Sequence, residues 1–175
     1  MTSSHFCPAE RQYRMPVPYG SQRPPTAQWT ATASGCTILA REGEGPYITH
    51  ITCGKIVDKG VTDANNMGAA MAPAAYDSLA AFFRGTGTGP RDYDLVITGD
   101  LGELGHAIVR DFFAKDGIDM GENFQDCGLL LYDRDKQDMR AGASGCGCSA
   151  SVLNGYLLTE MRRGKWKNIL FAPTG

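Results

Sequence analysis

Alternation of apolar and polar residues predicts two β-strands near the start of the chain, after an irregular opening segment. Five prolines within residues 1–27 exclude a long helix or a central strand there. Residues 29–41 are rich in threonine, isoleucine and small side chains, and residues 47–58 alternate between apolar and polar positions. Both patterns are typical of strands, so we expect strands over these two ranges, with a turn at residues 43–46.

Helical periodicity replaces this alternation from residue 65 onward. Asn65 and Asn66 are suited to cap a helix, and Pro73 should lie in its first turn or at a kink. The apolar residues of this first helix recur at helical spacing: Met71, Ala75, Leu79, Phe82 and Phe83. A second helix is predicted by Leu101, Leu104, Ile108 and Phe112. A third helix, which Gly164 should end, is predicted by Val152, Leu153, Tyr156, Leu157 and Met161.

Short apolar runs between these helices predict three further strands. They cover residues 94–98, 127–132 and 168–172. Strands that alternate with helices in this way are typical of an α/β protein in which helices cover both faces of a mostly parallel sheet. The pattern therefore predicts a mostly parallel sheet layered with helices.

Composition narrows the class of protein without naming a function. A length of 175 residues suits one domain with a sizeable core, and the formal net charge is −2. This charge gives no overall attraction to nucleic acid or to an anionic membrane. The chain shows neither an apolar run of about 18 residues nor a secretory signal. We therefore expect a soluble chain with no nucleic-acid partner.

The six cysteines indicate reduced thiols rather than a disulfide framework. The chain is longer than a disulfide-stabilised mini-protein, and most of the cysteines have apolar neighbours, so we expect buried thiols in a cytosolic compartment. Cys146 and Cys148 form C-x-C, which is not the C-x-x-C of zinc ribbons, and no histidine is near them in sequence. We expect no metal and no cofactor.

The first candidate for chemistry is the glycine loop at residues 98–105, Thr-Gly-Asp-Leu-Gly-Glu-Leu-Gly. Its G-x-x-G-x-x-G spacing differs from the G-x-G-x-x-G of dinucleotide-binding proteins, and Asp100 and Glu103 would repel a phosphate. A tight turn whose acidic groups favour the helix dipole is the preferred interpretation. Nucleotide binding remains the alternative.

The second candidate is the run of small residues at 141–149, which leads into a helix. Small residues let a backbone or a ligand approach closely, and the free N–H groups of the helix can receive a carboxylate. Cys146 and Cys148 have two interpretations: a lowered thiol pKa near the helix N-terminus, or small side chains in a tightly packed crossing. Packing is preferred for the thiols, and the loop as a whole is the better site candidate.

The third candidate is residues 3–14, which bring His5, Cys7, Glu10, Arg11 and Arg14 together in sequence. A Cys/His pair is compatible with a nucleophile, and the arginines can bind a carboxylate through paired N–H groups. A surface segment of ion pairs is the preferred interpretation. Other notable side chains should be structural: Trp29, Phe82 and Phe83 in the core, and His50 and His106 hydrogen-bonded or solvated.

Several long stretches resemble the stage V sporulation protein AD family of spore-forming bacteria. They are residues 3–14, 19–35, 63–75, 92–105, 126–133 and 141–150, and the resemblance covers essentially all 175 residues. The resemblance implies a thiolase-like fold built from two related halves. Residues 1–44 would then be the end of the N-terminal half, and residues 45–175 the C-terminal half without its last strand.

The resemblance also implies that the catalytic groups of thiolase-fold enzymes are replaced. The nucleophilic cysteine of those enzymes belongs to a region outside this chain. Gly99 stands where ketoacyl synthases have a histidine, and Met139 stands where thiolases have one. Ala143 stands where the synthases have an asparagine. A protein without these groups is expected not to be an enzyme.

By resemblance, the function is binding of dipicolinic acid, with a part in its uptake during sporulation and its release in germination. Implied partners are other stage V sporulation A membrane proteins and, for the intact protein, a second copy in a homodimer. The implied location is the forespore or spore, peripheral to the inner membrane through those partners. The alternatives are an acyltransferase of the same superfamily and a purely structural subunit of a membrane transporter. The candidate ligand-binding residues are His5, Arg11, Gly99, Asp100, Gly142, Ala143, Ser144, Gly145 and Cys146.

Overall fold

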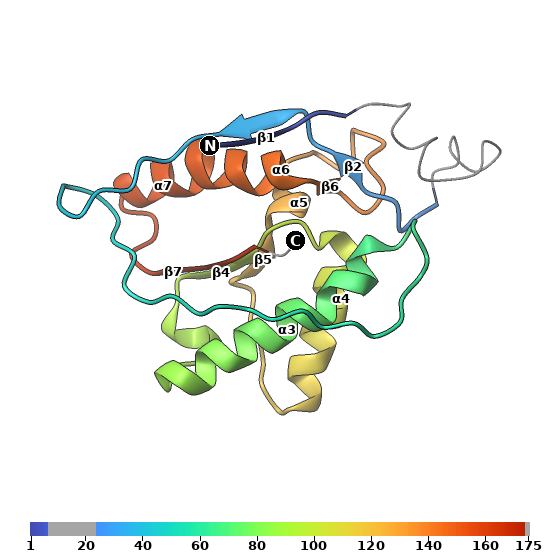
Figure 1. The fold of residues 1–175 in the computed structure, drawn as a ribbon, viewed down its shortest axis with the longest axis horizontal. Helices are drawn as coiled ribbons and strands as arrows, with labels where there is room; N and C mark the ends of the chain where they lie inside the picture. Colours follow the sequence, from blue (N-terminus) through green and yellow to red (C-terminus); the bar gives the residue numbers. More distant parts are fainter. Residues whose placement is uncertain (7–23, 174–175) are drawn as a thin grey trace.

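The computed structural model describes residues 1–6 and 24–173, and its centre is a parallel sheet between two layers of helices (Figure 1). The sheet contains β4 (Leu95–Thr98), β5 (Phe124–Asp126) and β7 (Ile169–Ala172), in the order β5-β4-β7. β4 pairs in parallel with both neighbours, so that Val96 lies between Phe124 and Leu170. The expected α/β class with a mostly parallel sheet is confirmed.

One face of the sheet is covered by α3 (Met67–Thr86) and α4 (Gly102–Lys115). The Asn66 side chain accepts a hydrogen bond from the Ala69 amide, which confirms the expected cap, and Phe82 and Phe83 are buried as expected. Pro73 lies in the second turn, inside the helix rather than in its first turn. The short 3₁₀ turn η1 (Pro90–Asp92) connects α3 to β4.

The second predicted helix is confirmed, but its buried face is shifted from the one we expected. α4 buries Gly102, Gly105, Val109 and Phe113, whereas Ile108 and Phe112 are only half-buried. Glycine at position 105 is required by the close approach of α3, because a Cβ there would lie 2.8 Å from the Gly68 carbonyl oxygen. The spacing of large apolar residues did not predict this buried face, because two of its four residues are glycines.

The opposite face is covered by one continuous helical segment. It consists of α6 (Cys146–Ser151), the π-helical turn η2 (Val152–Leu157) and α7 (Leu158–Arg162). Cys148, Val152 and Leu157 pack against Leu95 and Ile97 of β4, which point away from α3 and α4. The predicted third helix is confirmed and begins six residues earlier than its first large apolar residue.

Two short strand pairs lie beyond this helical segment and join distant parts of the chain (Figure 1). β1 (Thr2–Ser4) pairs antiparallel with β3 (Ala33–Gly35), and β2 (Trp29–Thr30) pairs parallel with β6 (Ala143–Ser144). The strand expected over residues 29–41 is therefore limited to two short pieces. Trp29 is half-buried and its ring contacts Phe6, with 4.4 Å between ring centroids.

Two expected strands are wrong. Residues 127–132 begin with the helical turn α5 (Cys127–Leu130), because the Asp126 side chain accepts a hydrogen bond from the Gly128 amide and caps it. Residues 47–58 form neither strand nor helix, and Ile51 and Ile56 are 79% and 98% exposed. Alternation creates a strand only where a neighbouring strand pairs with it, and this segment has none among the described residues.

Within residues 1–6 and 24–173, no helix combines the length and the apolar character needed to cross a membrane.

Candidate functional site

The two glycine-rich loops, residues 98–105 and 141–149, are in direct contact. The first connects β4 to α4, and the second contains β6 and the first turn of α6. The amide of Glu103 donates to the Ala141 carbonyl at 2.9 Å, and the amide of Gly145 donates to the Asp100 carboxylate at 2.7 Å. Most of the candidate ligand-binding residues therefore gather in one place.

Gln28 joins the two loops from a third segment. Its side-chain amide nitrogen donates to the Asp100 carbonyl at 2.7 Å and to the Ala143 carbonyl at 3.0 Å. Gly102 allows this approach, because a Cβ there would lie 2.7 Å from the same nitrogen. Sequence analysis missed Gln28, since a contact across 72 residues leaves no local pattern.

Asp126 organises the start of α4 and is completely buried. Its carboxylate accepts four hydrogen bonds, from the Thr98 hydroxyl at 2.6 Å and from the amides of Leu101, Gly102 and Gly128 at 2.9 to 3.0 Å. The N-terminal amides that a phosphate would need are therefore occupied by a carboxylate, which counts against nucleotide binding. An aspartate at the end of a strand and two residues before a glycine was the available sequence signal for this cap.

Asp100 faces the other loop instead of the start of its own helix. Only 9% of the residue is exposed, and burial raises the pKa of its carboxyl to about 6, with a smaller upward effect from Asp126. The hydrogen bond from Gly145 opposes this shift. We expected the Asp100 carboxylate to interact with the positive end of the α4 dipole. This expectation is wrong, because the Asp126 carboxylate accepts the amides at the start of α4.

The N-terminus of α6 is partly occupied by groups of the protein itself. Gly145, with φ of 95°, bonds to Asp100, and the Gly147 amide donates to the Ser4 hydroxyl at 3.0 Å. Ser4 in turn donates to the Ala31 carbonyl at 2.6 Å. A ligand carboxylate would have to compete with Asp100 and Ser4 for these amides.

The two thiols of the small-residue run differ in environment. Cys148 is buried, with its sulfur 3.9 Å from the Gly99 carbonyl oxygen, and burial raises its thiol pKa, as do the nearby Asp100 and Asp126. A lowered pKa is therefore wrong for Cys148, and the packing interpretation holds. Cys146 is exposed, and its thiol donates to the Ser3 carbonyl.

The expectation that most cysteines are buried is not confirmed. Cys127 and Cys148 are buried, whereas Cys36, Cys53 and Cys146 are exposed free thiols. Cys36 and Cys53 are exposed because the segment after β3 pairs with no other strand among the described residues. Cys146 is exposed because it lies at the edge of the β1–β3 pair, next to Ser3. Cys7 lies outside the described residues.

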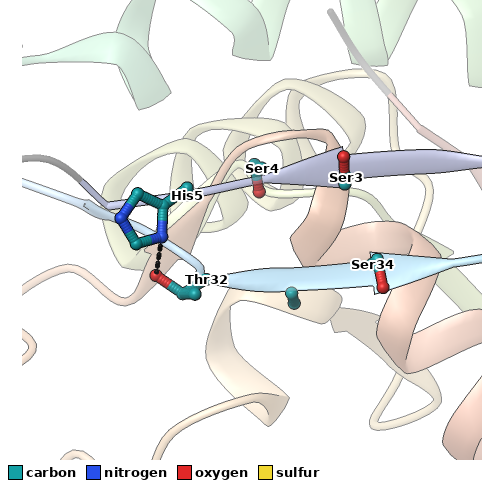
Figure 2. Close-up of a pocket in the computed structure, with 6 residues that line it drawn as sticks. Ser3, Ser4, His5, Thr32 and Ser34 are labelled. Carbon is teal, nitrogen blue, oxygen red and sulfur yellow. Dashed lines mark hydrogen bonds between the residues drawn. The ribbon is translucent and has the colours of Figure 1, made fainter.

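An open pocket of about 540 Å³ lies beside the β1–β3 pair, next to the start of α6 (Figure 2). Its lining is polar and small: Ser3, Ser4, His5, Thr32, Ala33 and Ser34. The His5 ring nitrogen Nδ1 lies 3.3 Å from the Thr32 hydroxyl. Of the chemically notable side chains in residues 3–14, His5 therefore lines this pocket. Glu10, Arg11 and Arg14 lie outside the described residues.

The two remaining histidines each contact a neighbouring oxygen. His106 Nε2 lies 3.1 Å from the Phe124 carbonyl oxygen, its ring stacks on Phe124, and burial lowers its pKa. His50 is exposed and contacts the Thr49 hydroxyl. In the described part of the chain, no group of three or more His, Cys, Asp or Glu side chains is arranged to hold a metal ion.

Substitutions in residues 141–149 test whether this run stabilises the chain through close backbone packing or through its thiols. A Cβ at this position would overlap the Ala33 carbonyl oxygen and the Ser4 hydroxyl, so Gly147→Val is expected to reduce the free energy of unfolding by about 1–3 kcal/mol. Cys146→Ala combined with Cys148→Ala should cost about 1 kcal/mol or less, because one of the thiols is exposed. Urea denaturation of both variants measures this difference. A greater loss from the alanine pair would contradict the packing interpretation.

Comparison with known proteins gives a consistent assignment. A family model described as "Stage V sporulation protein AD" matches residues 1–175. The chain is also 44% identical over 174 residues to the stage V sporulation protein AD of Bacillus subtilis (strain 168). This alignment covers 99% of the chain and 51% of that relative, so the chain spans about half the relative's length. The chain belongs to the stage V sporulation protein AD family.

Proposed function

We propose that a protein containing this chain binds dipicolinate without turning it over, and that it acts in dipicolinate uptake during sporulation and release in germination. The sporulation role follows the family to which the chain belongs. The observation that carries binding without catalysis is the meeting of loops 98–105 and 141–149, where Gly99 and Ala143 carry no catalytic side chain and the Cys148 thiol is buried with a raised pKa. This statement concerns the described residues.

An acyltransferase function is the weaker alternative. Acyl transfer needs a nucleophile, a base and a donor for the oxyanion. Gly99 and Ala143 supply no such side chain, and Cys148 is buried with a raised thiol pKa. His106 is already bonded to the Phe124 carbonyl. The exposed thiol of Cys146 bonds to the Ser3 carbonyl rather than to a histidine.

The ligand's two carboxylates require cations, since the amides of Gly145 and Gly147 already have acceptors. Arg11, Arg14 and Arg140 are the candidates. The Arg140 side chain is 44% exposed, and its Nε atom lies 3.2 Å from an Asp138 carboxylate oxygen. The backbone of Arg140 is in the left-handed region, with φ of 46°. Asp100 would repel a dianion when ionised, and its pKa of about 6 means that mild acid removes this repulsion.

The remaining proposals concern the whole assembly. We place residues 1–44 and 45–175 in the two halves of a thiolase-like fold. The ligand site would then receive residues from the length of the family protein that this chain does not cover. A homodimer, contact with other stage V sporulation A membrane proteins and a location in the forespore or spore belong to the same proposal. A purely structural subunit is the competing role.

Titration of the intact protein with dipicolinate, and with pyridine-2-carboxylate as the control ligand, tests the proposal. Loss of one charge-assisted carboxylate contact should weaken binding by about 1.5–3 kcal/mol, roughly ten- to a hundredfold. Arg140→Gln should weaken dipicolinate binding about tenfold, whereas the matched exposed cation change Arg91→Gln should leave it unchanged. Equal affinity for both ligands, no binding at all, or turnover of an acyl-CoA would contradict the proposal.

A further inference from the structure

The turn between α7 and β7 concentrates positive charge. Its four cations, called here the basic turn, are exposed: Arg162, Arg163, Lys165 and Lys167. Two carboxylates lie beside them. Glu160 pairs with Arg163 at 2.8 Å and approaches Lys165 at 4.0 Å, and Asp94 accepts the backbone amides of Lys167 and Asn168. Four cations and two carboxylates leave a surplus of two positive charges within this group of residues.

This surplus is unusual for the chain, whose formal net charge is −2. Elsewhere in the described residues, six of the ten cations form ion pairs with acids: Lys55 with Asp77, Arg91 with Asp119, Lys115 with Asp111, Arg134 with Glu103, Lys136 with Asp133, and Arg140 with Asp138. The chain as a whole is slightly negative, but the basic turn is a local positive patch that can attract an anionic surface.

Two aromatic rings belong to the same patch. Tyr156 and Trp166 meet edge to face with 5.6 Å between ring centroids, and Tyr156 is 39% exposed. The Lys165 ammonium lies 4.5 Å from the Trp166 ring centroid and 5.3 Å from that of Tyr156. It also donates to the Tyr156 hydroxyl at 2.9 Å, and this bond raises the pKa of Lys165, so the lysine is charged.

We propose that the basic turn, with Trp166 and Tyr156, binds the surface of an anionic phospholipid bilayer. Cations beside amphipathic aromatic rings match the phosphate and headgroup level of a bilayer. The four cations are exposed where α7 passes into β7, close to one end of the molecule (Figure 1). Single-stranded nucleic acid is the competing anionic partner, since it also binds cations and aromatic rings.

Sedimentation with phosphatidylglycerol vesicles, compared with phosphatidylcholine vesicles, tests this proposal on the full chain. We expect binding to phosphatidylglycerol only, weakening as salt rises. Each cation near an anionic surface strengthens binding about fivefold, so Arg162→Glu with Lys167→Glu should weaken binding at least tenfold. The matched pair Arg91→Glu with Lys115→Glu changes net charge equally at other exposed sites and should have much less effect. Far-UV circular dichroism confirms that each variant folds.

A fluorescence readout locates the contact. The chain has two tryptophans, so Trp29→Phe leaves Trp166 as the only one, and its emission should move to shorter wavelength with phosphatidylglycerol vesicles. The proposal is overturned by equal affinity for both lipids, by equal weakening in the matched pair, or by sedimentation without an emission shift. Binding of a single-stranded polynucleotide without vesicle binding would also overturn it and assign the patch to nucleic acid.

Discussion

Asp126→Ala is expected to lower the free energy of unfolding by about 3–5 kcal/mol, more than any other substitution considered for this chain. The carboxylate is fully buried and accepts four hydrogen bonds. Its removal leaves the Thr98 hydroxyl and the amides of Leu101, Gly102 and Gly128 without an acceptor. Each buried donor that loses its partner costs about 1–3 kcal/mol, and water entering the space left by the carboxylate offsets part of that total.

Two control substitutions make this prediction specific. Asp126→Asn keeps the shape but turns one acceptor oxygen into a donor that faces other donors, so an intermediate loss of about 2 kcal/mol is expected. Asp111→Ala removes an exposed carboxylate from α4, the helix whose first amides Asp126 accepts, and its ion pair with Lys115 should contribute less than about 0.5 kcal/mol. Urea denaturation gives all three values. A midpoint for Asp126→Ala close to that of the wild type would contradict the assignment of Asp126 as the central cap.

The sequence predicted those elements whose signals are local. β4 is a short apolar run with both faces buried, and α3 begins where Asn66 caps it. The run at residues 127–132 is equally apolar, yet Asp126 converts its beginning into a helical turn by accepting the Gly128 amide. One side chain outside the run therefore decided its structure. Hydrophobicity alone does not distinguish a buried strand from a buried helical turn.

The candidate site was predictable only in part for a related reason. Runs of small residues indicate where backbones approach closely, and loops 98–105 and 141–149 do meet. The groups that occupy the space between them come from far away in sequence. Gln28 bonds to positions 72 and 115 residues distant, and Ser4 reaches Gly147 across 143 residues. No local pattern encodes such contacts, so neither Gln28 nor Ser4 stood out as a joining residue.

Asp100→Asn is expected to stabilise the chain at pH 8 and to leave its stability unchanged near pH 4. The carboxyl of Asp100 has a pKa of about 6 in the folded state against an ordinary 3.8, mainly because of burial. Well below pH 4 the group is protonated in both states, and at pH 4 its ionisation in the unfolded state changes the relative stability by only about 0.5 kcal/mol. As pH rises toward 6, the unfolded state releases this proton first, so the folded state loses about 2–3 kcal/mol of relative stability.

The asparagine cannot titrate, and its carbonyl oxygen can still accept the Gly145 amide. The difference between the two proteins isolates this one group, because every other titration is shared. Thermal or urea unfolding at unit steps from pH 4 to pH 8 should show a difference that grows between pH 4 and pH 6 and then levels off. The acid that faces Asp100 is Asp126, whose charge disfavours the ionised form of Asp100, while the Cys148 thiol beside it is neutral over this pH range. A difference that does not vary with pH, or a less stable variant at pH 8, would show that Asp100 is solvated or paired with a cation.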